Sequence, residues 1–227
     1  MPAGPTMNEQ AYERLRSAVV LLELQPGERV SSLDLADRLA LPVAGVRYAI
    51  QRLDTEGVLL VAPRAPTVVA PLSISEVRQA YMARTALEAL AARLASRRGT
   101  EAQLTGMRGE LDQVSAASLS SGRVTRDAAV QMSLHLHGFH RGLAAAAHNQ
   151  VLDKLLRQAT TLTERFEHYR VVALGLAPPP LDDYVALLDA IARRDPDAAE
   201  TIVHTRLGGE RWRTSTAELD DMTVTAS

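Results

Sequence analysis

Apolar residues in the first quarter of the chain recur at the spacing of helices that each bury one face. The pattern predicts one helix over residues 8–24 and a second that begins at Ser31 or Ser32. A third carries Val46, Ala49, Ile50 and Leu53 on one side and stops at Gly57, as a helix with a glycine C-cap does. A tight turn between the second and third predicts a helix-turn-helix.

Two short β-rich runs follow the third helix. They cover residues 58–62 and 67–70, with Pro63-Arg-Ala-Pro66 as a turn between them, and Val30 is placed to pair with the hairpin. Three helices followed by a two-stranded hairpin is the order of a winged helix-turn-helix, which we place at residues 8–70.

Beyond Pro71-Leu-Ser73 the pattern is helical almost to the end of the chain. Glycine, proline and short polar segments separate the helices, which we expect near 74–97, 101–118, 125–147, 149–173, 181–193 and 196–212. The sequence therefore predicts a mostly α protein. An all-α bundle at 74–213 follows the winged helix, and a polar, frayed tail occupies 214–227.

The composition of the chain excludes several classes of protein and of site. The chain has no cysteine, which excludes disulfides and thiolate metal sites, and no run of 18 apolar residues. Its N-terminus lacks the pattern of a secretion signal, so we expect a cytoplasmic protein with no membrane span. Glycine-rich phosphate loops and nucleophile elbows are also missing, so we do not expect an enzyme.

The charge distribution bears on nucleic-acid binding. The net charge is −2, and residues 1–70 hold seven arginines against eight acidic residues, so any basic footprint is a local patch. The free face of the third helix carries Arg47, Tyr48, Gln51 and Arg52, residue types that contact bases and phosphates when a helix enters the major groove.

These segments together resemble the GntR family of bacterial transcription regulators, in the FadR-like subgroup whose C-terminal domain is an FCD domain. The resemblance spans roughly residues 10–210. It rests on pieces whose order and spacing match the family pattern: Leu24-Gln-Pro-Gly-Glu-Arg29, Leu35-Ala36, Val46-Arg47, Arg52-Leu53, Glu56-Gly57, Arg84-Thr-Ala-Leu-Glu88, Phe139-His140, Asn149, Ala190-Ile191, Asp195 and Ala198-Ala199. It implies a DNA-binding head and a small-molecule-binding helical domain.

The chain departs from the family where the recognition helix begins. Pro42-Val-Ala-Gly45 replaces the family's Ser-Arg-Thr-Pro, so Val43 stands where the resemblance implies a base-contacting arginine and Ala44 where it implies a phosphate-bonding hydroxyl. The DNA contacts that remain are Arg47, Tyr48, Gln51 and Arg52, with Arg64 as a phosphate or minor-groove contact from the hairpin.

The metal site that the resemblance implies, one Asp and three His, is also altered. Leu136 stands at the Asp position, His140 is kept, and Tyr184 and Arg206 replace the other two histidines. We therefore expect no cofactor and a polar pocket instead. A re-registered site for a divalent metal, built from His137, His140 and His204, stays open as an alternative.

Arg206 gives this pocket its expected chemistry. A guanidinium inside a helical bundle needs an anionic partner, which is either a ligand carboxylate or one of Glu88, Glu164 and Glu167. We expect Arg84, His137, His140, Tyr184 and Arg206 to bind a small anionic effector.

The sequence therefore predicts a ligand-responsive transcription regulator that acts as a homodimer on a short palindromic operator in double-stranded DNA. The alternative is a ligand-binding or catalytic helical protein with a vestigial DNA-binding head.

Overall fold

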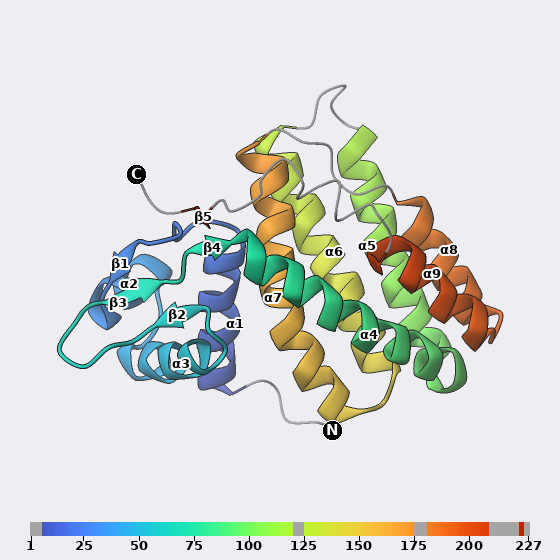
Figure 1. Ribbon diagram of the computed structural model, residues 1–227, viewed down its shortest axis with the longest axis horizontal. Helices are drawn as coiled ribbons and strands as arrows, with labels where there is room; N and C mark the ends of the chain where they lie inside the picture. The colour runs from blue at the N-terminus through green and yellow to red at the C-terminus, as the bar shows by residue number, and fades with distance from the viewer. Residues whose placement is uncertain (1–5, 120–124, 175–180, 209–222, 225–227) are drawn as a thin grey trace. The chain divides into compact units, whose positions relative to one another are not determined.

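The computed structural model describes residues 6–119, 125–174, 181–208 and 223–224, without the side chains at 118–119, 206–208 and 223–224. The chain divides into two compact units (Figure 1). Unit 1 holds residues 1–73 and 222–227, and unit 2 holds residues 74–221. The two units are described separately below.

Unit 1 has the helices and hairpin of a winged helix-turn-helix. Its helices are α1 (Met7–Val20), α2 (Ser32–Leu39) and α3 (Val43–Thr55), and its strands are β1 (Arg29–Val30), β2 (Leu59–Leu60), β3 (Thr67–Val69), β4 (Leu72–Ser73) and β5 (Thr223–Val224). β1, β3 and β2 form one antiparallel sheet, in which Val30 pairs with Thr67 and Leu60 with Val68. Val30 thus joins the hairpin as predicted.

Helix ends in unit 1 follow local chemistry. The Ser31 hydroxyl accepts from the Asp34 N–H at 3.1 Å and caps α2. Gly57, with φ of 72°, follows the end of α3 in the left-handed conformation that its position requires. The prediction was wrong at the end of α1, which stops at Val20 rather than residue 24, because Leu22 takes a φ of 57°.

One apolar core holds the three helices and the sheet of unit 1 together. Tyr12 and Leu15 of α1, Leu35 of α2 and Leu53 of α3 are all fully buried there. Gly45 allows the close approach of α3 to α1, since a Cβ at that position would lie 3.0 Å from the Cβ of Ala11. Gly45, one of the residues that depart from the family pattern, therefore has a packing role.

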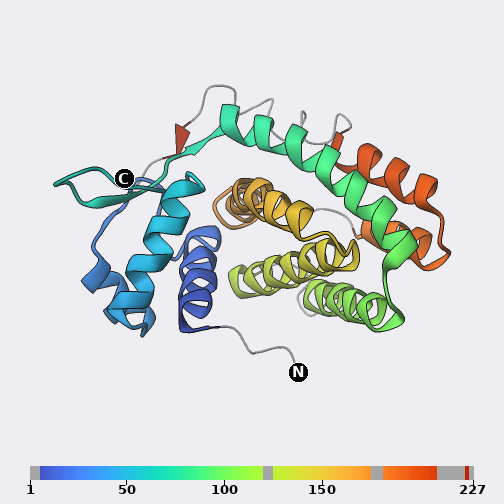
Figure 2. The same cartoon turned by 90° about the horizontal axis from the view of Figure 1, so that it is seen from below.

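Unit 2 is a bundle of long helices: α4 (Ile74–Arg98), α5 (Glu101–Leu119), α6 (Arg126–Ala146), α7 (Gln150–Val172), α8 (Asp182–Ala192) and α9 (Pro196–Gly208). α4 packs against α6, α7, α8 and α9, and α5 packs against α6 and α8 (Figure 2). The last predicted helix extended to 212, and residues 209–212 lie outside the described part. None of the described helices combines the length and apolarity of a membrane crossing.

Small residues let two of these helices pack closely. Gly138 and Gly142 lie one turn apart on α6, and a Cβ at Gly142 would lie 2.6 Å from the Met107 side chain of α5. The carboxylate of Glu110 occupies the corresponding space above Gly138 and pairs with His135 at 2.7 Å.

One short pairing was missed by the sequence. β5 lies in the segment predicted to be a frayed tail, yet Thr223 and Val224 pair with Ser73 and Leu72 of β4. The rest of that tail, residues 214–222 and 225–227, lies outside the described part of the chain. A two-residue strand carries too little periodicity to be predicted from sequence.

Candidate functional site

The exposed face of α3 is the first candidate site. Arg47, Tyr48 and Gln51 are exposed there, and Tyr48 is 39% exposed. No hydrogen bond or ion pair joins Arg47 to another described residue, so its guanidinium is available to a ligand. The side chains that the sequence placed on the free face of this helix thus point away from the core, apart from Arg52.

Arg52 is held within unit 1. Its guanidinium carbon lies 3.6 Å from the centre of the Tyr12 ring, and its Nε donates to the Glu56 carboxylate at 3.3 Å. The Tyr12 hydroxyl donates to both oxygens of the same carboxylate at 2.9 Å. Burial and the charge of Glu56 raise the pKa of Tyr12, which keeps this hydroxyl a donor. Arg52 therefore stabilises the packing of α3 on α1.

Three other arginines of unit 1, Arg14, Arg16 and Arg38, are held within the unit or buried in it. Arg14 pairs with Glu23 at 2.8 Å, Arg38 pairs with Glu28 at 2.7 Å, and Arg16 is buried. Arg64, exposed at the tip of the hairpin with φ of 61°, makes no ion pair with a described residue. Of the arginines predicted to contact DNA, Arg47 and Arg64 are therefore the two that internal pairs leave available.

The second candidate site is a group of buried polar side chains inside unit 2. We call it the buried polar cluster, and it is formed by α4, α6, α7 and α8: Arg84, Glu88, His137, His140, Thr163, Glu164 and Tyr184. Each of these residues is at most 7% exposed. The structure thus brings together four of the five predicted effector-binding residues. Arg206 lies on α9, and its side chain is outside the described part.

Arg84 is the centre of the cluster. Its Nη1 donates to the Thr163 hydroxyl at 2.6 Å, and its Nη2 lies 3.3 Å from the Glu88 carboxylate and 2.6 Å from His140 Nε2. His140 Nδ1 lies 2.6 Å from the same Glu88 oxygen. These distances fit a tautomer in which Nδ1–H donates to Glu88 and Nε2 accepts from Arg84.

The charge of Arg84 is maintained by its neighbours. Burial acts to lower the pKa of its guanidinium, and the negative charges around it, Glu88 foremost, raise the pKa above its ordinary value. Arg84 Nε is inaccessible to water and has no hydrogen-bond partner among the described residues. The cluster therefore contains a permanent buried cation with one unused donor.

Two further groups complete the cluster. His137 Nε2 lies 3.9 Å from the Glu164 carboxylate. The Tyr184 ring meets the rings of Phe139 and His140 edge-on, with centroids 5.4 and 5.7 Å apart. The sequence did not single out Thr163 for this site, although threonine at 160, 161 and 163 on an otherwise buried helix face was an available signal.

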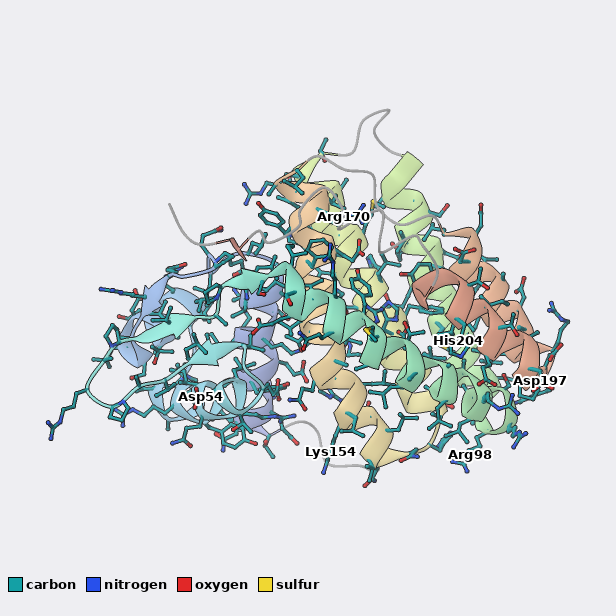
Figure 3. All side chains as sticks on the ribbon, in the orientation of Figure 1. Asp54, Arg98, Lys154, Arg170, Asp197 and His204 are labelled. Carbon is teal, nitrogen blue, oxygen red and sulfur yellow. The ribbon has the colours of Figure 1, made fainter. Side chains whose placement is uncertain are left out.

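The cluster does not suit a divalent metal. Leu136 and Tyr184 stand at two expected ligand positions, and the Arg84 guanidinium occupies the side of His140 that faces the cluster. The alternative set fails on His204, whose side chain is 54% exposed and pairs with Glu200 (Figure 3). The described residues contain no group of three or more ligating side chains able to hold a metal ion.

Two family models match consecutive parts of the chain. The model for bacterial regulatory proteins of the gntR family matches residues 7–69, and the FCD domain model matches residues 79–208. This chain belongs to the GntR family of regulators with an FCD domain. The resemblance deduced from the sequence is confirmed, as is the mostly helical fold with an N-terminal winged helix-turn-helix. Unit 1 thus contains the GntR DNA-binding domain, and unit 2 the FCD domain.

Curated relatives are transcription regulators. The HTH-type transcriptional repressor RspR of Escherichia coli K12 is 25% identical over 202 residues, which cover 88% of this chain and 84% of RspR. The Nta operon transcriptional regulator of Aminobacter aminovorans is 27% identical over 185 residues, covering 81% and 83%. The family and these relatives therefore indicate transcription regulation.

Solved structures share the fold over nearly the whole chain. E. coli McbR/YncC superposes with a TM-score of 0.77 at 19% identity and covers 94% of this chain and 99% of its own. A GntR regulator from Rhodococcus sp. RHA1 gives a TM-score of 0.70 at 20% identity, covering 92% and 98%.

Proposed function

We propose that this GntR regulator binds a short palindromic operator as a homodimer, through Arg47, Tyr48 and Gln51 of each α3, and that a small anionic effector bound in the FCD domain controls the binding. Arg64 adds a phosphate or minor-groove contact. A regulator that binds the bacterial chromosome acts in the cytoplasm, so the cytoplasmic location expected from the sequence is part of this proposal.

The DNA-binding part rests on the exposed, internally unpaired guanidinium of Arg47 on α3. An arginine in this position donates two parallel hydrogen bonds to a guanine or contacts a phosphate. Arg52, by contrast, gains its main contacts from Tyr12 and Glu56, so we assign it a supporting role. Only two of the predicted DNA-contacting arginines, Arg47 and Arg64, are available in each head, which implies that non-specific, charge-driven affinity is low.

The effector part rests on Arg84. A buried guanidinium with an unused Nε donor beside His140 and Tyr184 offers a carboxylate a charge-assisted hydrogen bond and two polar neighbours. Glu88 already compensates the charge of Arg84, so a bound carboxylate would require a further cation. Arg206 supplies that cation in this proposal, because it stands at a position that contributes to the family's binding site.

A thermal-shift assay tests the effector assignment. Succinate, pyruvate and benzoate serve as probes, and native mass spectrometry of the purified protein identifies any compound that it retains. Arg206→Ala should remove the shift that an active carboxylate produces in the wild type and leave the fold intact. His204→Ala, an exposed position two residues earlier on α9, is the matched control and should keep the shift. An unchanged carboxylate affinity in Arg206→Ala would refute the assignment.

The internal pairing of Arg14 and Arg52 and the burial of Arg16 favour a second candidate, a helical ligand-binding or catalytic protein with a vestigial DNA head. The two candidates predict different ratios of two affinities, the affinity for DNA from the chain's own upstream region and the affinity for a scrambled duplex. Equal affinity for the two duplexes favours the vestigial head. Conversion of a bound carboxylate by the purified protein would favour catalysis.

A further inference from the structure

The turn of the helix-turn-helix and the first residues of α3 carry apolar side chains throughout. The segment Leu39-Ala-Leu-Pro-Val-Ala-Gly-Val46 has no polar side-chain atom. Pro42 and Ala44 are exposed, and Val43 is partly buried because it packs against the core of unit 1. We call Pro42, Val43 and Ala44 the apolar turn surface. The DNA contacts proposed so far do not use it.

The apolar turn surface is continuous with the proposed DNA-binding face of α3. Ala44 precedes Arg47 by three residues and Tyr48 by four, so the three side chains are neighbours on one helix face. All three are exposed, and Gln51 continues the same face. A DNA groove that receives the guanidinium of Arg47 therefore also receives Ala44.

The charges of α3 indicate which of its ends approaches the bases. Residues 43–51 contain one arginine and no acidic residue. The last turn instead carries Asp54, labelled in Figure 3, which is exposed and accepts from the Val61 N–H at 2.9 Å. Its Arg52 is already paired with Glu56. Since phosphates repel the exposed carboxylate, the N-terminal end of α3 is the end that reaches the base edges.

Short apolar side chains at this end fit one feature of the major groove. Thymine presents a C5-methyl group there, and the other base edges present hydrogen-bond donors and acceptors. An apolar side chain that covers a donor or acceptor leaves it unpaired, which costs free energy. The same side chain gains free energy when it removes a methyl group from water.

We infer that Val43 and Ala44 contact the C5-methyl group of a thymine in each operator half-site, and so select an A·T pair beside the Arg47 contact. The inference rests on the proposed function, and it deepens that function by naming a base that the operator contains. Helix neighbours three residues apart lie about 5–6 Å from each other, so the thymine lies within about two base pairs of the Arg47 contact.

The test begins with a duplex that the protein itself selects. The full chain is used to enrich binding sequences from a library of random duplexes. Each thymine of the enriched duplex is then replaced, one at a time, by deoxyuridine, which keeps the base pairing and lacks only the C5-methyl group. Binding is measured by fluorescence anisotropy.

One thymine per half-site should respond. Losing its methyl group should weaken binding about fourfold, and losing it in both half-sites about 15-fold. The loss should be the same at low and at high salt, because no phosphate contact changes. Deoxyuridine outside the half-sites is the control and should leave the affinity unchanged.

Two protein variants identify the residue that meets the methyl group. In Ala44→Gly or in Val43→Ala, the loss caused by deoxyuridine in one half-site should fall below about twofold, because the partner of the methyl group is missing. Ala44 is exposed, so Ala44→Gly leaves the core of unit 1 intact. Ala116→Gly, at an exposed alanine of α5, is the matched control and should keep the full loss.

The outcomes separate this inference from the proposed function. A library that yields no enriched sequence contradicts sequence-specific binding, and with it the thymine contact. An enriched duplex in which no deoxyuridine weakens binding overturns the thymine contact alone. A deoxyuridine loss that stays unchanged in both variants overturns the assignment to Val43 and Ala44.

Discussion

Glu88→Gln tests whether the carboxylate of Glu88 balances the positive charge of Arg84 inside the FCD domain. The Glu88 side chain is 2% exposed, and its Oε1 accepts from Arg84 Nη2 at 3.3 Å and from His140 Nδ1 at 2.6 Å. The substitution keeps the size and removes the charge, so Arg84 is left buried without an anion in hydrogen-bonding contact. Breaking a buried pair from one side costs about 3–5 kcal/mol. We expect the free energy of unfolding to fall by that amount.

The assay is urea unfolding followed by far-UV circular dichroism, with calorimetry as a second measurement. In a chain of this size, 3–5 kcal/mol corresponds to a fall of roughly 10 °C in Tm. Asp153→Asn is the matched control, because Asp153 and Arg157 are also four residues apart and lie 3.0 Å from each other at about 30% exposure. That pair should contribute less than about 1 kcal/mol. A loss in Glu88→Gln no larger than the control's would refute a charged, buried Arg84–Glu88 pair.

Three further predictions address unit 1, the α5–α6 contact and the charge of the DNA-binding head. Tyr12→Phe removes the hydroxyl that donates to Glu56 and should lower the free energy of unfolding by about 1–2 kcal/mol in the same urea assay, since Glu56 keeps Arg52 as a partner. Gly142→Ala should lower the free energy of unfolding by about 1–2 kcal/mol, because the new methyl group meets Met107. In Gly109→Ala the methyl group meets nothing within 4 Å, so this variant should stabilise α5 by up to about 1 kcal/mol. The opposite order of stabilities would contradict the packing described. If Arg47 and Arg64 of each head are the arginines that contact DNA, four per dimer, the slope of log K against log salt for DNA binding should be about −4, and a slope steeper than about −7 would show that other basic residues contact phosphate.

The spacing of apolar residues, with the capping and turn residues between helices, was sufficient to predict most of the fold. Val46, Ala49, Ile50 and Leu53 of α3 face the core of unit 1 and recur at helical spacing, and Gly57 and Ser31 mark helix ends through local backbone chemistry. The end of α1 was missed because no residue there disfavours a helix. The chain leaves the helix at Leu22 so that Leu24 can be buried in the core, and a single sequence does not show that tertiary gain.

The sites were less accessible to sequence reasoning than the fold. Spacing placed Arg52 on the free face of α3, but its partners Tyr12 and Glu56 are separated from one another by 44 residues, and only the packed unit brings them together. Likewise, the four-residue spacing of Arg84 and Glu88 puts both on one helix face, while the contacts of Arg84 with His140 and Thr163 span 56 and 79 residues. Long-range pairs of this kind decide which charged groups remain available to a ligand.

The most direct test of the central claim is the affinity of the full chain for a labelled duplex from its own upstream region, measured by fluorescence anisotropy against a scrambled duplex of the same length. We predict that the wild type prefers its own upstream DNA by at least about 1,000-fold. Arg47→Ala should weaken that binding by about tenfold or more, because a base or phosphate contact is lost. Equal affinity of the wild type for both duplexes, or an Arg47→Ala variant that binds as tightly as the wild type, would contradict the account.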